Sequence, residues 1–318
     1  MLLVTDDLRD CIGKTPLLEL KRVFPMSAAR VFAKLEFVNP MSIKDRAVLS
    51  MVTAAIQAGR ITPETEVVEA SSGNTAIAIA MLGVLMNFRV RIFMSELASA
   101  ERGRIICAYG ATVVVTPGAE HTRGARERAI RYCKERPHST LFLNQHSNPS
   151  NGFAHETTTG PEIWEQTGGE LDVMVIGLGT SGTFDGLSRF LKRKKPDVRI
   201  VGFEPESSPV YSGGVQGRHK LIGIGPGFIT DNYKRSMHNM DEMILVPDDE
   251  AYAMTRKLAR TEGLLVGPTS GAAAWVCSKL NDRSELAGKT LACLFCDTGE
   301  RYLTTVGLFP ADTVERAV

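Results

Sequence analysis

The chain has 318 residues, 43% hydrophobic and 23% charged, which is the composition of a folded protein with a sizeable core. Its 37 Lys and Arg nearly balance its 36 Asp and Glu, which argues against nucleic acid or a membrane surface as the main partner. The start, MLLVTDDLRD, lacks the pattern of a secretion signal, and six cysteines do not form a disulfide framework, so we expect a cytoplasmic protein.

Strand-like and helix-like segments alternate along the chain. Strands are predicted at 31–37, 66–70, 89–94, 112–116, 140–144, 172–177, 199–205 and 290–296. Helices are predicted at 44–58, 76–87, before Gly110, at 122–136, up to Lys195, at 248–262 and at 270–281. This alternation predicts an α/β fold of two lobes, each with a mostly parallel twisted sheet flanked by helices. Turn residues gather in 145–171, where we expect the lobe boundary.

The sequence GLGTSG at 177–182 follows a predicted strand and precedes a predicted helix. Glycines at this spacing bring backbone N–H groups to a phosphate at a helix N-terminus. With Glu204 ending the next strand, the pattern alone also fits a nicotinamide-dependent oxidoreductase, or a plain strand–helix turn. The hydroxyls of Thr180, Ser181 and Thr183 favour a terminal phosphate, which has more oxygens to satisfy than a pyrophosphate bridge.

The next candidate site is the segment NPMSIKDR (39–46), which contains a lysine. Ser42 and Asp45 form an S-x-x-D capping pattern, and Lys44 lies in the first turn of the predicted helix. The helix dipole there lowers the pKa of an amine and favours its use as a nucleophile. Taken alone, this motif is better explained by a solvated surface lysine.

Polar groups follow three further strands. The segment EASSGNTA (69–76) offers an anion nest sized for a carboxylate, and NQHSNP (144–149) and CDTGERYL (296–303) also stand at strand ends, the last with the hydroxyl of Thr298. Cys293 and Cys296 are three apart in a predicted strand, so they point to opposite faces and cannot share a metal. An amine, a phosphate cradle, a carboxylate nest and a hydroxyl at a strand end are together what pyridoxal 5'-phosphate (PLP) requires.

In this order the motifs resemble the cysteine synthase (O-acetylserine sulfhydrylase) family of PLP-dependent enzymes, related to cystathionine β-synthase and tryptophan synthase β. The resemblance runs from IGKTPLLEL (12–20) through TTGPEIW, GIGPGF (223–228) and EGLLVGPTSGAA (262–273) to ERYL (300–303). It implies PLP fold type II, with a smaller mobile lobe at 36–148 and a larger lobe formed by 1–35 and 149–318. A homodimer is also implied.

The resemblance also implies site roles. Lys44 is expected to link covalently to PLP and to act as the base at Cα, Asn74 to bind the 3′-oxygen and Thr298 to face the ring nitrogen. The phosphate is expected on Gly179, Thr180, Ser181, Gly182 and Thr183. The substrate carboxylate is expected on Ser71, Ser72, Asn74, Thr75 and Gln145. No metal is expected.

The implied reaction is β-replacement on an activated L-serine, O-acetylserine or O-phosphoserine, through an α-aminoacrylate, with sulfide giving L-cysteine. The sequence departs from the family pattern: NPMSIK is one residue shorter before the lysine, and Ala98 and Gly103 replace the usual Met and Arg. An amine or thiol amino acid therefore stays open as the nucleophile, as in diaminopropionate-type or cystathionine synthases. If Asp297 rather than Thr298 met the ring nitrogen, the argument for β-replacement would reverse.

Overall fold

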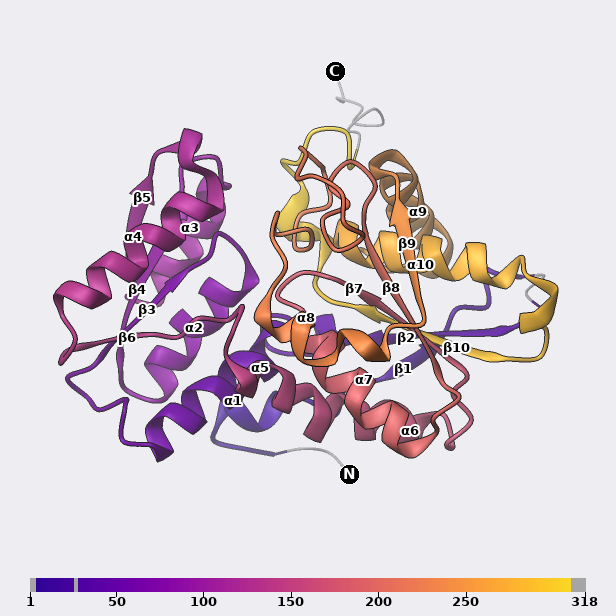
Figure 1. Cartoon of the computed structure of the whole chain (residues 1–318), viewed down its shortest axis with the longest axis horizontal. Helices are drawn as coiled ribbons and strands as arrows, with labels where there is room; N and C mark the ends of the chain where they lie inside the picture. Colours follow the sequence, from indigo (N-terminus) through magenta and orange to yellow (C-terminus); the bar gives the residue numbers. More distant parts are fainter. Residues whose placement is uncertain (1–3, 26–27, 310–318) are drawn as a thin grey trace, which may run out of the picture.

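The chain folds around two separate sheets (Figure 1). The computed structural model describes residues 4–25 and 28–309. The larger sheet has the strand order β1-β2-β10-β7-β8-β9, and every neighbouring pair is parallel except β1 with β2. Its strands are β1 (Leu17–Glu19), β2 (Arg30–Leu35), β7 (Val173–Gly177), β8 (Arg199–Pro205), β9 (Glu242–Val246) and β10 (Thr290–Phe295).

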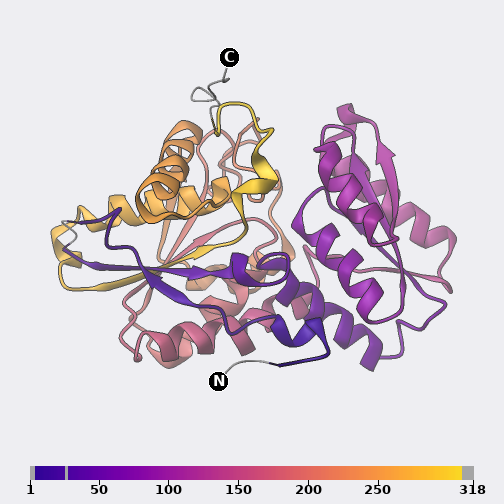
Figure 2. The ribbon, with the colours of Figure 1, turned by 180° about the vertical axis from the view of Figure 1, so that it is seen from behind.

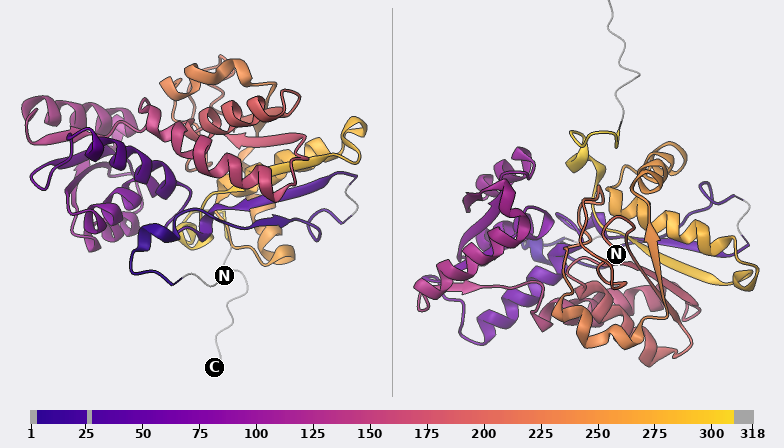
Figure 3. Two further views of the ribbon diagram at one scale, coloured as in Figure 1. Left: turned by 90° about the horizontal axis from the view of Figure 1, so that it is seen from below. Right: turned by 45° about the horizontal axis from the view of Figure 1, so that its top comes forward.

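The smaller sheet is parallel throughout, with the order β5-β4-β3-β6. Its strands are β3 (Glu66–Ala70), β4 (Arg89–Ser95), β5 (Thr112–Thr116) and β6 (Thr140–Phe142). Figure 2 and Figure 3 show from other sides that this sheet and its helices stand apart from the larger sheet.

Helices cover both faces of each sheet, as parallel sheets require. The helices are α1 (Lys44–Gln57), α2 (Asn74–Leu85), α3 (Ala100–Ala108), α4 (His121–Glu135), α5 (Pro149–Ala154), α6 (Gly160–Gln166), α7 (Gly182–Lys194), α8 (Asp231–Ser236), α9 (Asp248–Glu262) and α10 (Pro268–Asn281). Short helical turns lie at Leu8–Cys11, Glu36–Val38, Gly118–Glu120, Met237–Asn239, Ser284–Leu286 and Gly299–Tyr302, and a π-helical turn at His155–Thr159.

Alternate residues of each strand enter different cores. In β3, Val67 packs in the core that contains α1 and α2, whereas Val68 packs against α4. In β10, Cys293 lies in the core with α9 and α10, whereas Leu294 lies with α7. No helix within the described ranges is long and apolar enough to cross a membrane.

The predicted α/β architecture is confirmed, although β1, β9 and α8 were not predicted and the segment 145–171 differs from the prediction. This segment holds α5, the π-helical turn and α6. The residues that suggested turns start these helices: Asn148 accepts a hydrogen bond from Ser150 N as an N-cap, and Pro149 and Pro161 occupy first-turn positions. Lobe limits at 36 and 148, and movement of the smaller lobe, stay predictions.

Candidate active site

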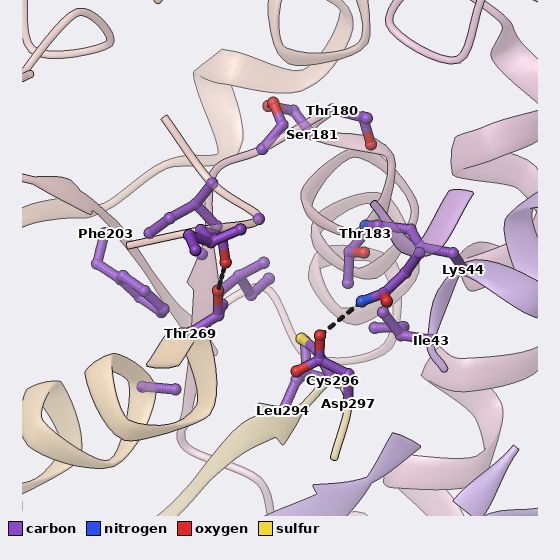
Figure 4. A pocket seen from close by; sticks show the side chains of 18 of the residues that line it. Ile43, Lys44, Thr180, Ser181, Thr183, Phe203, Thr269, Leu294, Cys296 and Asp297 are labelled. Atoms are coloured by element: carbon purple, nitrogen blue, oxygen red, sulfur yellow. Dashed lines mark hydrogen bonds between the residues drawn. The ribbon is translucent and has the colours of Figure 1, made fainter. Parts of the chain in front are cut away.

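One cavity lies at the carboxyl edge of the larger sheet (Figure 4). It is lined from the larger sheet by the ends of β7, β8 and β10 and from the other side by the starts of α1 and α2. The lining residues relevant to chemistry are Lys44, Asn74, Gly179, Thr180, Ser181, Thr183, Thr269, Cys296 and Asp297. The predicted amine and the predicted phosphate loop therefore share one cavity.

Lys44 supplies the amine. Burial lowers its pKa, while the nearby side chains of Cys296 and Asp297 act electrostatically in the opposite direction. Within the described part of the chain, no acid forms an ion pair with Lys44 Nζ and no acceptor binds it. A half-buried amine without a counter-ion holds its proton weakly, which suits it to covalent bonding and to proton transfer.

The short turn before Lys44 is held by the capping pattern that the sequence predicts. Asp45 Oδ2 accepts from Met41 N at 2.7 Å and from Ser42 N at 3.1 Å. Ser42 Oγ in turn accepts from Lys44 N at 3.2 Å. These hydrogen bonds close the turn on Asp45 immediately before α1.

The loop between β7 and α7 is built for close approach. A Cβ on Gly179 would lie 2.6 Å from Gly223 O, and a Cβ on Gly182 would lie 1.9 Å from Asn151 Oδ1. Ser181 adopts a left-handed conformation, with φ of 60°, immediately before α7 begins. These constraints bring the hydroxyls of this loop and the N-terminus of α7 to one place, the arrangement that binds a phosphate group.

The hydroxyls of this loop are oriented by buried partners. Ser181 Oγ donates to Tyr211 Oη at 3.1 Å, and Tyr211 Oη donates to Gly179 O at 2.9 Å. Thr183 Oγ1 lies 3.2 Å from His155 Nε2. Burial holds the pKa of His155 well below its ordinary value, so the ring is neutral and adds no charge to the loop. Sequence reasoning missed Tyr211 and His155 because both lie far from the motif along the chain.

The predicted carboxylate nest lies beside the cavity rather than in its lining. Only Asn74 among its residues lines the cavity. Thr75 Oγ1 donates to Gln145 Oε1 at 2.6 Å, and the carbonyl of Ser72 accepts from Arg102 at 3.3 Å. Ser71 Oγ accepts from Gly73 N at 3.3 Å. The structure thus brings 71–75 and Gln145 together, at the ends of β3 and β6.

The role predicted for Thr298, facing the ring nitrogen, stays a prediction. Thr298 does not line the cavity, whereas Cys296 and Asp297 do. After β10 the backbone of Thr298 pairs with Val266 in an isolated antiparallel bridge. A hydroxyl is supplied instead by Thr269, at the start of α10, which the sequence analysis did not single out although its PTSG segment lies within a recognised motif.

Glu204 is not placed to bind a nucleotide. Its side chain is fully buried and accepts from Tyr211 N at 2.8 Å, Ser212 N at 2.7 Å and Ser212 Oγ at 2.6 Å. The carboxylate holds the loop after β8, so the feature that suggested a ribose contact is structural. Cys293 likewise lies in the core while Cys296 faces the cavity.

The fold and site define an α/β protein in which a lysine amine and a hydroxyl-rich strand–helix loop line one cavity. The chain belongs to the pyridoxal-phosphate dependent enzyme family, which matches residues 8–297. The free amine and the hydroxyls of the 179–183 loop in one cavity fit PLP, and the glycines at 179 and 182 let this loop pack closely against Gly223 and Asn151.

Known proteins narrow the class to enzymes of the cysteine synthase type. The chain is 41% identical to a probable cysteine synthase of Bacillus subtilis over 309 residues, 96% of this chain and 98% of that protein. The cysteine synthase (OASS) of Entamoeba histolytica superposes with a TM-score of 0.92 at 37% identity, covering 99% of this chain and 93% of the other. The O-acetylserine dependent cystathionine beta-synthase of Helicobacter pylori gives 0.91 at 33% identity, covering 97% of this chain and 100% of the other.

Proposed function

We propose that this chain catalyses β-replacement on an activated L-serine, O-acetylserine or O-phosphoserine, with sulfide as the nucleophile and L-cysteine as the product. One observation carries the proposal: the Lys44 amine and the 179–183 loop line the same cavity. Similarity to cysteine synthases over nearly the whole chain supports sulfide as the nucleophile.

The cofactor would be held at its two ends by different elements. Lys44 would bond to its aldehyde, and Gly179, Thr180, Ser181, Gly182 and Thr183 would take its phosphate at the start of α7. Asn74 would donate to its 3′-oxygen. When bound, PLP supplies an aldehyde that links to amines and a ring that accepts electrons from the bond broken at Cα.

Thr269 is our candidate for the ring nitrogen. The aldehyde and the nitrogen lie at opposite ends of the PLP ring, and Asp297 acts electrostatically on Lys44, at the aldehyde end. Asp297 Oδ2 is also occupied by Asn74 and Tyr302. A hydroxyl at the nitrogen leaves it unprotonated, which favours loss of a β-substituent over transamination.

Different side chains of the protein would bind the substrate carboxylate and remove the proton from Cα. Ser71, Ser72, Asn74, Thr75 and Gln145 would bind its carboxylate through hydroxyl, amide and backbone donors at the start of α2. Lys44, displaced from the aldehyde by the substrate amine, would take the proton from Cα, and burial, which lowers its pKa, favours the unprotonated amine that this step needs.

Borohydride reduction tests the cofactor and lysine together. The purified protein should be yellow, and reduction followed by mass spectrometry should place the cofactor on the peptide containing Lys44. Lys44→Ala should lose the covalent adduct and about a thousandfold of the turnover, the scale of a lost general base. A protein that stays colourless after addition of PLP would overturn the proposal.

A thiol or amine amino acid is the second candidate for the nucleophile. It is favoured by Ala98 and Gly103 in the segment 96–104, which depart from the family pattern, and by the similarity to the H. pylori enzyme. The two candidates are separated by feeding O-acetylserine or O-phosphoserine with sulfide, homocysteine or glutamate. Slowest turnover with sulfide would exclude cysteine as the main product.

We also propose a homodimer in the cytoplasm. The dimer rests on the family resemblance, and the location is supported by the six free cysteines, which are ordinary in a reducing compartment. Sedimentation equilibrium would test the dimer, and fractionation of cells would test the location.

A further inference from the structure

The carboxamide of Asn74 is held between two charged groups of opposite chemistry. Asn74 Nδ2 donates to Asp297 Oδ2 at 2.5 Å, and Asn74 Oδ1 accepts from Arg301 Nη1 at 2.6 Å. A carboxylate only accepts hydrogen bonds and a guanidinium only donates them. Turning the amide over would put like groups in contact on both sides, so its orientation is fixed.

Asp297 is itself held in place. It is 2% exposed, and Tyr302 Oη donates to its Oδ2 at 2.5 Å. A Cβ on Gly267 would lie 2.2 Å from Asp297 Oδ1, so the chain leaves room for this carboxylate by having glycine there. Asp297 Oδ1 is buried without a hydrogen-bond partner among the described residues. Burying a carboxylate oxygen without a hydrogen bond costs folding free energy, which indicates that Asp297 is kept for a specific role.

Arg301 connects Asn74 with the turn that carries Lys44. Its Nη2 donates to Met41 O at 2.6 Å while its Nη1 holds Asn74. Arg301 and Asp297 come from the end of the larger sheet, whereas Asn74 starts a helix of the smaller one. The same short segment therefore sets both Asn74 and the turn before Lys44.

We propose that Asp297 and Arg301 are positioning residues that lock Asn74 so that it presents an N–H donor to the cavity. Asn74 Nδ2 has two hydrogens, and Asp297 takes one, which leaves the other for a ligand. The lock selects an acceptor oxygen and rejects a donor at that point. With PLP as the ligand, which rests on the proposed function, that acceptor is the 3′-oxygen in its anionic form.

A double-substitution cycle on cofactor binding tests the lock. Asn74→Ala and Asp297→Asn should each weaken PLP binding to the cofactor-free protein about tenfold, the scale of one charge-assisted hydrogen bond, and should shift the visible absorption in the same direction. The double variant should bind no more weakly than Asn74→Ala alone. A full tenfold loss from Asp297→Asn in the Asn74→Ala background would overturn the proposal.

Controls separate the lock from folding and from the proposed function. Glu300→Gln removes an exposed carboxylate from the same segment and should bind PLP as the wild type does. Tyr302→Phe removes one hydrogen bond that holds Asp297 but leaves the carboxyl group in place, and it should weaken PLP binding severalfold. This variant replaces Asp297→Asn in the test if Asp297→Asn does not fold.

If the wild-type chain binds no PLP, the proposed function fails, and urea unfolding of the cofactor-free protein decides the lock. There the Asn74→Ala and Asp297→Asn shifts in urea midpoint should be non-additive, and strict additivity would overturn the lock.

Discussion

At the scale of single residues, Thr269 offers a sharp test of how the cavity holds its cofactor. Its hydroxyl lines the cavity and donates to the carbonyl of Ile222 at 3.1 Å. Thr269→Val keeps the shape but removes the hydroxyl, so PLP affinity should fall about three- to tenfold and the visible absorption should shift. Titration of the cofactor-free protein with PLP measures both.

Thr298→Val is the matched control for that substitution. Thr298 is half-buried and lies outside the cavity lining, so this variant should bind PLP as the wild type does. A larger loss of PLP affinity from Thr298→Val than from Thr269→Val would instead support Thr298 as the residue at the ring nitrogen. At this strand end Asp297 lines the cavity and the next residue does not, and a sequence motif alone does not show which residue at a strand end reaches the cavity.

Glu69 makes the stability of the smaller sheet depend on pH. Burial raises its pKa to about 7 from an ordinary 4.5, although the backbone N–H groups of Gln145 and Ala70 oppose the shift. The folded chain therefore keeps a proton that the unfolded chain loses as pH rises from 4.5 to 7. Across this window the wild type should lose on the order of 3 kcal/mol of stability relative to Glu69→Gln.

Urea midpoints measured below pH 4.5 and above pH 7 check this sign. Glu66→Gln in the same strand is the control, because hydrogen bonds from Arg91 and Tyr132 outweigh burial and lower the pKa of Glu66. The wild type should gain stability relative to Glu66→Gln as pH rises through 4.5. Equal signs for the two variants would contradict the assignment of Glu69 as a buried, largely protonated acid.

At the scale of secondary structure, the start of α7 is the most constrained element of the site. Gly182→Ala would drive a Cβ to within 1.9 Å of Asn151 Oδ1. Asn151 cannot move freely, because its Nδ2 donates to Gln145 O at 2.8 Å and to Thr180 Oγ1 at 3.2 Å. The substitution should lower the urea midpoint and weaken PLP binding about tenfold, since loop and helix start shift together.

Gly103→Ala in α3 is the control for Gly182→Ala. Its Cβ would meet only the flexible Met94 Cε, at 3.1 Å, and alanine is the better helix former. This variant should bind PLP normally and should be no less stable than the wild type. Weak PLP binding by both variants, or by neither, would show that the close approach at Gly182 does not control the phosphate loop.

The strands and helices that are buried on both faces were predicted well. Predicting them also located the motifs that stand at the strand ends. The apolar runs of β3, β7 and β10 are short and continuous, which is typical of strands buried on both faces, and the helices after them show helical spacing. Among the features that were not predicted, β1 is only three residues long, and the π-helical turn at His155–Thr159 interrupts a polar helix. His155, which orients Thr183, sits in that turn, so its role required the folded structure.

At the scale of the whole molecule, a buried ion cluster joins segments far apart in the chain. Glu162 in α6 accepts from Arg46 at 2.7 and 2.8 Å and from Lys14 N at 2.9 Å, and its Oε2 lies 2.7 Å from Lys34 Nζ. Arg46 is two residues after Lys44 in α1, and Lys34 lies in β2. The cluster therefore connects α1, the helix that begins at Lys44, to the larger sheet.

Glu162→Gln should weaken this ion cluster, and the resulting loss of stability should depend on pH. Burial alone would raise the pKa of Glu162, but the hydrogen bonds and charge of Arg46 outweigh it and hold the pKa at about 2, against an ordinary 4.5. A lowered pKa stabilises the folded chain above pH 4.5, and that stability is lost as pH falls toward 2. Above pH 4.5 the variant should lose about 3 kcal/mol, the scale of a buried pair with one partner removed.

Urea midpoints of wild type and variant at neutral and at acid pH measure the gap, which should close toward pH 2. Glu165→Gln, an exposed carboxylate in the same helix, should show no gap at either pH. Because Arg46 shares a helix with Lys44, Glu162→Gln should also slow turnover while leaving PLP affinity closer to normal than Gly182→Ala does. A gap that stays constant with pH would mean that Glu162 stabilises the ion cluster by packing rather than by charge.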